Sequence, residues 1–275
     1  MSGDAETPQA RVLIIAGSDS GGGAGIQADI KAVTMLGGYA MTAVTAITAQ
    51  DTTGVHGVWP VALDAVEAQM RACLADIGAD AIKTGMLGTA PLVELVAEEL
   101  DARARDVARV IDPVMVATSG DRLVDDKAVS AIASLLVRRA ALVTPNAPEA
   151  EVLTGKSVDG INGQRRAAEA LLEQGAKAAL IKGGHIAGNP LIDVLQTEQG
   201  EWIFESERVE TRSTHGTGCT LASACAAHVG QGMDVPKAVE KARDYLFGAI
   251  KHAPGLGQGH GPVAHNWTLL EREGS

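Results

Sequence analysis

A glycine-rich run in the last third of the chain has the composition of an anion-binding turn. It extends from Thr214 to Cys219 (THGTGC), and the small, mostly apolar residues 221–227 follow it. Glycines let several backbone N–H groups converge on one point, and a helix N-terminus adds positive potential there. The spacing predicts an anion hole at Gly216, Thr217 and Gly218 for the charge on a transferring phosphoryl group. The alternative is an ordinary glycine-rich connection between a strand and a helix.

Cys219 occupies the first turn of the helix predicted after this run. The positive potential of a helix N-terminus favours a thiolate, so Cys219 is a candidate to accept a proton from a substrate hydroxyl or to orient it. The alternative is a buried, inert cysteine. With Cys73 and Cys225 it makes an odd, sparse set without C-x-x-C spacing, which predicts neither a disulfide framework nor a zinc site.

Hard oxygen ligands and a lysine follow three other apolar runs. Asp112 ends one run, and Asn146-Ala-Pro-Glu149 follows the next, so two carboxylates suited to magnesium are expected to converge. The alternative is a helix start, because Asn146 and Glu149 have capping-box spacing. Lys182 precedes two glycines and is expected either to contact a phosphate or to lie in solvent.

The elements that must position these residues alternate between strands and helices, which predicts an α/β fold with a mostly parallel sheet. Apolar faces of helical period mark helices between the strands, and 191–211 reads as an antiparallel edge hairpin turning at 198–201. Ligands of such sheets bind beyond the carboxyl ends of the strands, where polar residues and glycines collect here. Strands are predicted at 12–16, 43–48, 81–84, 108–112, 141–144 and 178–182, and two late helices at 218–230 and 235–252.

No linker or repeat divides the chain. The prediction is a single domain at 12–267, a flexible leader at 1–11 and a C-terminal tail at 268–275. The glycine-rich segment 255–261 is compatible with an ordered or a mobile loop.

The composition and charge of the chain limit the kinds of molecule that it is expected to bind. The chain has 275 residues, 46% of them hydrophobic, enough for the core of one large domain. Its formal net charge is -11, and no cluster of Lys and Arg forms a basic stripe, which argues against a nucleic acid partner. No stretch approaches the roughly 20 apolar residues of a membrane span, so we expect a cytoplasmic protein without a membrane partner.

A second glycine-rich segment, 21–25, partly resembles two nucleotide-binding motifs. It lacks the Lys-Ser/Thr ending of a Walker A loop. Gly23-x-Gly25-x-x-Ala28 matches a dinucleotide fingerprint literally, but the preceding strand ends too early and no acidic residue ends the next strand. Both interpretations are therefore weak.

The same N-terminal region carries a family resemblance. The run from Ala16 to Asp29 (AGSDSGGGAGIQAD) resembles the signature of hydroxymethylpyrimidine/phosphomethylpyrimidine kinases, members of the ribokinase-like superfamily. The resemblance extends from Val12 to Trp267. Seven later stretches agree in the same order, at 45–54, 83–87, 112–115 with 119–121, 144–149, 182–185, 214–219 and 259–263.

The resemblance implies a three-layer α-β-α ribokinase-like fold, ATP with Mg2+ as cofactors, and a homodimer. It implies two phosphoryl transfers to the hydroxymethyl arm of an aminopyrimidine, giving first the monophosphate and then the diphosphate for thiamine biosynthesis. The amide of Gln50 is then expected to hydrogen-bond the aminopyrimidine. By matched motif, the implied sites are Gly17, Ala24, Gln50, Met86 and Val114 for the pyrimidine; Asn146, Lys182, Thr214 and the turn 216–218 for the ATP phosphates; and Asp112 and Glu149 for magnesium.

Two alternative functions and two differences from the pattern of related kinases remain. Sugar kinases of the superfamily carry Asp where Cys219 stands, whereas related pyridoxal kinases share the Cys, so a pyridoxal kinase is the nearest alternative and Gln50 favours the pyrimidine. A non-catalytic pyrimidine-binding protein is the rival from another class. Ser20-Gly21 stands where relatives often have Pro-Ser, which leaves the closure of that loop open. We also expect the loop 117–122 to act as a lid over ATP.

Overall fold

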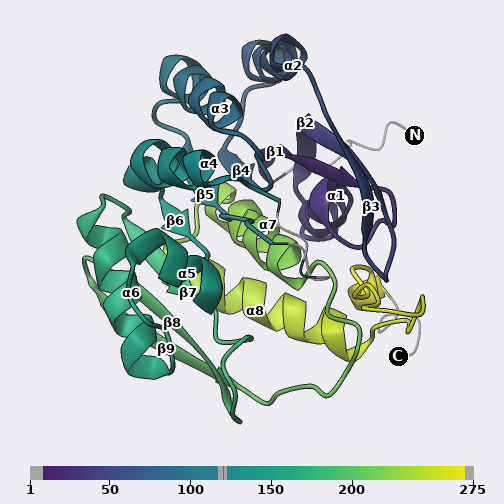
Figure 1. The fold of residues 1–275 in the computed structure, drawn as a ribbon, viewed down its shortest axis with the longest axis vertical. Coiled ribbons are helices and arrows are strands. Elements are labelled where there is room, and N and C mark those ends of the chain that lie inside the picture. Colours follow the sequence, from purple (N-terminus) through teal and green to yellow (C-terminus); the bar gives the residue numbers. More distant parts are fainter. Residues whose placement is uncertain (1–8, 117–119, 121–122, 270–275) are drawn as a thin grey trace, which may run out of the picture.

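The computed structural model describes residues 9–116, 120 and 123–269, and within them the strands form one mixed sheet (Figure 1). Its order is β3-β2-β1-β4-β5-β6-β7-β8-β9. The strands from β2 through β7 run parallel, while β3 at one edge and β8 and β9 at the other are antiparallel. The strands are β1 (Arg11–Asp19), β2 (Tyr39–Gln50), β3 (Val55–Pro60), β4 (Ala81–Thr84), β5 (Ala108–Ile111), β6 (Leu142–Val143), β7 (Ala178–Ile181), β8 (Leu191–Thr197) and β9 (Gly200–Ser206).

Helices cover both faces of this sheet and make the three layers expected from the sequence. Helices α2 to α6 pack on one face, and α1, α7 and α8 pack on the other (Figure 1). The helices are α1 (Gly25–Met35), α2 (Leu63–Asp76), α3 (Ala90–Arg103), α4 (Asp126–Ala131), α5 (Ala147–Thr154), α6 (Ile161–Glu173), α7 (Thr217–Gly230) and α8 (Val235–Lys251). A π-helical turn (Ile132–Leu136) and a 3-10 turn (Val137–Arg139) continue α4.

Strand β1 shows why the central strands read as continuous apolar runs. Leu13 and Ile15 belong to the core under α2 to α6, while Val12 and Ile14 belong to the core under α1, α7 and α8. Alternate side chains of one strand thus enter two different cores, so every position from Val12 to Ala16 is buried. The predicted α/β fold with a mostly parallel sheet is confirmed.

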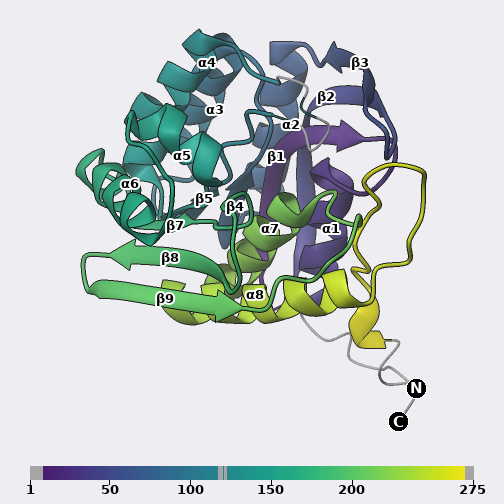
Figure 2. The same ribbon diagram turned by 60° about the horizontal axis from the view of Figure 1, so that its bottom comes forward.

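Both edges of the sheet are antiparallel, although the sequence indicated only one. The hairpin of β8 and β9 is confirmed and lies along α8 (Figure 2). Strand β3 was not predicted, because VHGVWP contains a glycine, ends in proline and leaves Val58 and Trp59 exposed, so it lacks an apolar period.

The loop at 255–261, which the sequence left open, is an ordered connection. The N–H of His260 donates to the carbonyl of Thr52 (2.8 Å), and that of Gly261 donates to the carbonyl of Arg212 (3.2 Å). His215 in turn donates its N–H to the carbonyl of Gly261 (3.1 Å). The yellow loop in Figure 2 therefore ties the β2–β3 turn to the segment before α7.

One position beside this loop makes stability depend on pH. His265 is 5% exposed, its Nε2 lies 2.9 Å from Thr220 Oγ1, and burial lowers its pKa to about 4. Below about pH 6.5 the unfolded chain binds a proton at this histidine, whereas the folded chain leaves it unprotonated until about pH 4.

We therefore expect His265 to remove about 1.4 kcal/mol of stability per pH unit as the pH falls from 6.5 toward 4. Urea unfolding at several pH values measures the slope, and His265→Gln should flatten it, because glutamine does not titrate. Parallel slopes for the two proteins would contradict the assignment.

Candidate active site

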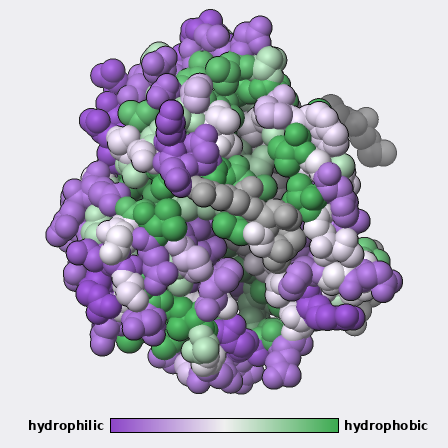
Figure 3. Space-filling model, in the orientation of Figure 1, coloured by the Kyte–Doolittle hydropathy of each residue, from purple (hydrophilic) through white to green (hydrophobic). Residues whose placement is uncertain are grey.

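A cavity of about 930 Å3 opens at the carboxyl ends of the parallel strands. It lies at the switch point, where β1 pairs with β2 on one side and with β4 on the other, the place where α/β sheets bind ligands. On the face of the molecule shown in Figure 3, hydrophilic side chains lie along most of the outline. Apolar patches lie nearer the middle of this face. All the site residues proposed from the sequence line this cavity: Gly17, Ala24, Gln50, Met86, Asp112, Val114, Asn146, Glu149, Lys182, Thr214, Gly216, Thr217, Gly218 and Cys219.

The anion-binding turn has the geometry that its glycines suggested. Gly216 is the N-cap of α7 with φ +78°, a conformation that side chains disfavour. A Cβ on Gly216 would lie 1.8 Å from the carbonyl oxygen of Gly23, so the turn and the glycine loop are in direct backbone contact. A Cβ on Gly218 would lie 3.2 Å from Lys182 Nζ. An ammonium and a helix N-terminus therefore converge where an anion is expected.

Lys182 belongs to a charged cluster and is not a solvated lysine. Its side chain is 13% exposed, and its Nζ lies 3.3 Å from Asp112 Oδ1 and 4.0 Å from Glu149 Oε2. Burial alone would lower its pKa, but these two carboxylates raise it above its ordinary value. Lys182 therefore stays charged at the cavity wall.

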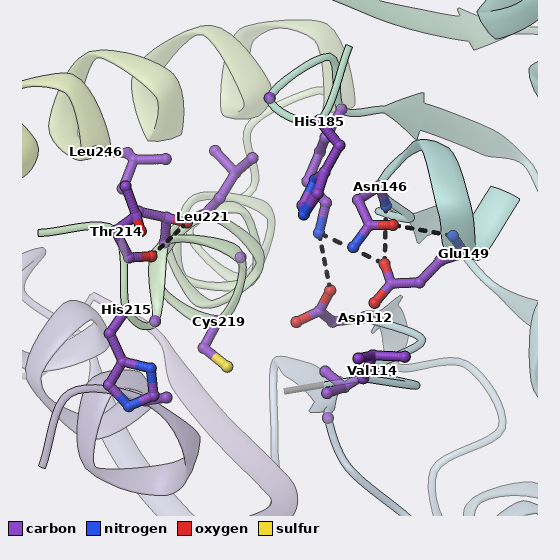
Figure 4. A pocket seen from close by; sticks show the side chains of 18 of the residues that line it. Asp112, Val114, Asn146, Glu149, His185, Thr214, His215, Cys219, Leu221 and Leu246 are labelled. Atoms are coloured by element: carbon purple, nitrogen blue, oxygen red, sulfur yellow. Dashed lines mark hydrogen bonds and ion pairs between the residues drawn. The ribbon is translucent and has the colours of Figure 1, made fainter. Parts of the chain in front are cut away.

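Asn146 and Glu149 form the capping box that their spacing predicted. The Asn146 side chain accepts from the N–H of Glu149 (2.9 Å), and Glu149 Oε2 accepts from the N–H of Asn146 (2.8 Å), which completes a capping box on α5. The same box turns Glu149 toward Asp112 and Lys182 (Figure 4). Burial, together with Asp112, raises the pKa of Glu149 to about 7.

The donor set fits a magnesium ion held partly by phosphates. Among the described residues, Asp112 Oδ2 is buried and has no hydrogen-bond partner. Within the described ranges, no three His, Cys, Asp or Glu side chains come together as a complete metal site. Magnesium usually takes one or two carboxylates and fills its shell with water and substrate phosphates. Asp112 and Glu149 suit that role.

The charge state expected for Cys219 was wrong. Burial raises the pKa of its thiol to about 12, even though Lys83 lowers it in part. Desolvation is the largest effect on this pKa and the carboxylates of Asp29 and Asp112 add to it, so together they outweigh the helix N-terminus. Cys219 faces the cavity as a neutral thiol (Figure 4), which suits it to orient a hydroxyl rather than to accept its proton.

Alkylation rates can contradict this charge state, because an accessible thiolate in the folded protein would react quickly. At pH 7.5 a thiol of pKa about 12 is thiolate in roughly one molecule in 10⁴ or fewer, against about one in ten for an unperturbed thiol. We expect iodoacetamide to modify Cys219 at least about 100-fold faster in urea than in the folded protein, as measured by peptide mass. Comparable rates in both states would show a thiolate in the fold.

Two buried polar pairs beside the cavity were not predicted from the sequence. Lys83, inside the fully buried strand β4, lies 2.9 Å from Asp29 of α1, and both side chains are 0% exposed. His215, left unassigned from the sequence, pairs with Asp19 at 2.9 Å. A lysine inside the predicted strand 81–84 was the available signal for the first pair; no spacing indicated the second.

A second part of the cavity was also not predicted from the sequence. It is apolar and formed by helices α7 and α8, where Leu221 and Leu246 project inward (Figure 4) beside Phe247 and Ile250. The predicted lid at 117–122 lies outside the described residues, apart from Gly120.

No helix in the described part of the chain has both the length and the apolar character needed to cross a bilayer.

Known proteins resemble this chain over most of its length. The family model described as phosphomethylpyrimidine kinase matches residues 19–264. A hydroxymethylpyrimidine/phosphomethylpyrimidine kinase of Streptomyces coelicolor is 48% identical over 260 residues, covering 94% of this chain and 96% of its own. One of Bacillus subtilis is 42% identical over 256 residues, covering 93% and 94%.

Solved structures share the fold. The pyridoxal kinase of Bacillus subtilis in an ADP complex has a TM-score of 0.87 at 36% identity, covering 94% of this chain and 98% of its own. The phosphomethylpyrimidine kinase of Clostridium difficile has a TM-score of 0.79 at 36% identity, covering 87% and 99%. With a family match over most of its length and relatives above 40% identity, the chain belongs to the phosphomethylpyrimidine kinase family.

Proposed function

We propose that this protein transfers the γ-phosphoryl group of ATP to the hydroxymethyl group of an aminopyrimidine, and then a second one to the resulting monophosphate, for thiamine biosynthesis. The observation that carries this proposal is one cavity in which Lys182 and the turn at Gly216 face the glycine loop and Gln50. Relatives named for both phosphorylation steps, at 40–48% identity, support it.

Phosphoryl transfer needs mainly positioning and neutralisation of charge. In this proposal the N–H groups of 216–218 and the ammonium of Lys182 stabilise the transferring group. Asp112 and Glu149 hold Mg2+, which neutralises charge on the phosphates when it is bound. Cys219 orients the attacking hydroxyl, and the apolar end near Leu221 and Leu246 receives the adenine ring.

A pyridoxal kinase is the second candidate, because solved neighbours at 35–36% identity carry that name. Two observations favour the pyrimidine. The curated relatives at higher identity are named pyrimidine kinases, and Gln50 lines the cavity with an amide that suits an aminopyrimidine edge.

The deciding experiment incubates the purified protein with ATP, magnesium and one substrate: hydroxymethylpyrimidine, its monophosphate or pyridoxal. Product masses identify each transfer. Diphosphate from both pyrimidines supports the proposal, activity on pyridoxal alone favours the second candidate, and no turnover of any of the three contradicts both.

We further propose that the protein is a cytoplasmic homodimer. Its three cysteines are unpaired, as suits a reducing compartment, and Ile47, Val58 and Trp59 expose apolar surface on the sheet edge at β2 and β3. Light scattering after gel filtration tests the dimer, and a monomer over the micromolar range contradicts it.

A further inference from the structure

His215 is buried where the glycine loop meets the anion-binding turn. It is 6% exposed, and its Nε2 lies 2.9 Å from Asp19 Oδ2. Asp19 also accepts hydrogen bonds from the N–H groups of Gly21, Gly23 and Ala24. Burial alone would raise the pKa of Asp19, but the bonds from His215 and the backbone lower it below its ordinary value. Asp19 is therefore a carboxylate that can only accept, so His215 Nε2 carries a proton.

The side chain of Gln50 lies between His215 and Thr48. Its Nε2 lies 3.5 Å from His215 Nε2, and its Oε1 lies 3.3 Å from Thr48 Oγ1. The single proton of the Thr48 hydroxyl has two acceptors in reach, the carbonyl of Ser18 at 2.9 Å and Gln50 Oε1 at 3.3 Å, and the shorter contact takes it. Toward Gln50 the hydroxyl then offers only its lone pairs.

Both contacts are therefore mismatched as the amide is drawn. At His215 the Gln50 NH2 group faces a protonated nitrogen that cannot accept, and at Thr48 two oxygen acceptors face each other. A half-turn of the Gln50 amide, which exchanges its nearly identical oxygen and nitrogen positions, corrects both contacts at once. The carbonyl oxygen then shares the Nε2–H of His215 with Asp19 in a three-centre hydrogen bond, and the NH2 group donates to Thr48.

We propose that His215, held by Asp19, is a specificity-determining positioning residue that fixes the orientation of the Gln50 amide. This inference rests on the proposed function. In the fixed orientation, one lone pair and one N–H of Gln50 remain for the cavity that it lines. An amino group beside a ring nitrogen offers the matching donor and acceptor. A ring without that amino group cannot pair in the same way, so the orientation selects aminopyrimidines.

The test compares hydroxymethylpyrimidine with its analogue that lacks only the ring amino group. His215→Phe keeps a ring of similar size and removes the N–H donor, while His215→Gln places an amide nitrogen near the position of Nε2. We expect His215→Phe to lower the preference for the amino compound, as the ratio of kcat/KM values, by about 10- to 100-fold. His215→Gln should restore most of that ratio, and the KM for ATP should stay within about threefold.

The outcomes separate this inference from the proposed function. If wild-type protein turns over the amino compound but His215→Phe slows both compounds equally, His215 has only a structural role and the inference is overturned. If wild-type protein does not turn over the amino compound, the proposed function itself fails.

A second pair of variants tests the inference if His215→Phe folds poorly. Thr48→Val removes the acceptor for the Gln50 NH2 group, while Thr48→Ser keeps it. We expect the ratio to fall in Thr48→Val and to hold in Thr48→Ser, and an unchanged ratio in Thr48→Val overturns the inference.

Discussion

Replacing Gly216 with alanine is expected to lower kcat by about 10²- to 10³-fold, the loss typical of a damaged oxyanion hole. Gly216 has φ +78°, and the added Cβ would lie 1.8 Å from the carbonyl oxygen of Gly23 and 3.1 Å from Ala24 Cα. These are backbone atoms, so no side chain can rotate to make room. The first turn of α7 must move away from the glycine loop, and its N–H groups then no longer point at the transferring phosphoryl group.

Gly155→Ala is the matched control for this variant. Gly155 also has a positive φ, +68°, at the C-cap of α5, but no atom lies within 4 Å of the position of its missing Cβ. It should lose about 1 kcal/mol of stability and keep its kcat. Initial rates with saturating ATP measure the effect, and thermal melting shows that each variant is folded. A folded Gly216→Ala protein with wild-type kcat would remove the turn from the mechanism.

The largest expected effect on stability comes from Lys83→Met, which should cost about 3–5 kcal/mol by leaving a buried carboxylate without its partner. Lys83 Nζ lies 2.9 Å from both oxygens of Asp29, and Ser223 donates to Asp29 Oδ1 at 2.7 Å. Burial alone would lower the pKa of Lys83, but the carboxylates of Asp29 and Asp112 raise it above its ordinary value. The folded protein therefore contains a charged pair with no contact to water.

The double variant Lys83→Met/Asp29→Asn distinguishes a lost ion pair from a lost shape. It removes both charges and should recover a substantial part of the stability, because no unpaired charge remains. In Lys83→Met alone, the lone carboxyl of Asp29 is expected to take up a proton in the folded state. Its folded pKa then exceeds its unfolded pKa, so the free energy of unfolding should fall as the pH rises. Urea unfolding measures both; a loss below about 1 kcal/mol in the single variant would sink the argument.

The sequence predicted those parts of the fold and site that depend on local pattern. Strand β4 was predicted at its observed bounds, because it is a short apolar run between turn residues and is buried on both faces. Strand β3 was missed, because its exposed Trp59 and its glycine break that pattern. Residue types at the ends of strands indicated which side chains line the cavity.

Properties that depend on distant partners were not predictable from spacing. His215 and Asp19 lie 196 positions apart, and Ser223 and Asp29 lie 194 apart. The charge of Cys219 required the burial of its thiol, which only the packing of α7 sets. The expected thiolate followed correctly from the helix N-terminus, but desolvation was the larger effect.

The position of α7 has a consequence for how the chain is made. This helix packs against β1, β4 and β5, yet it leaves the ribosome more than 100 residues after the last of them. Until then Val12, Ile14 and Val110 lack the cover that completes their core. Contacts of such long sequence separation form late and fold slowly. The nascent chain therefore carries an uncovered apolar sheet face through much of its synthesis, the interval in which chaperones have the most surface to bind.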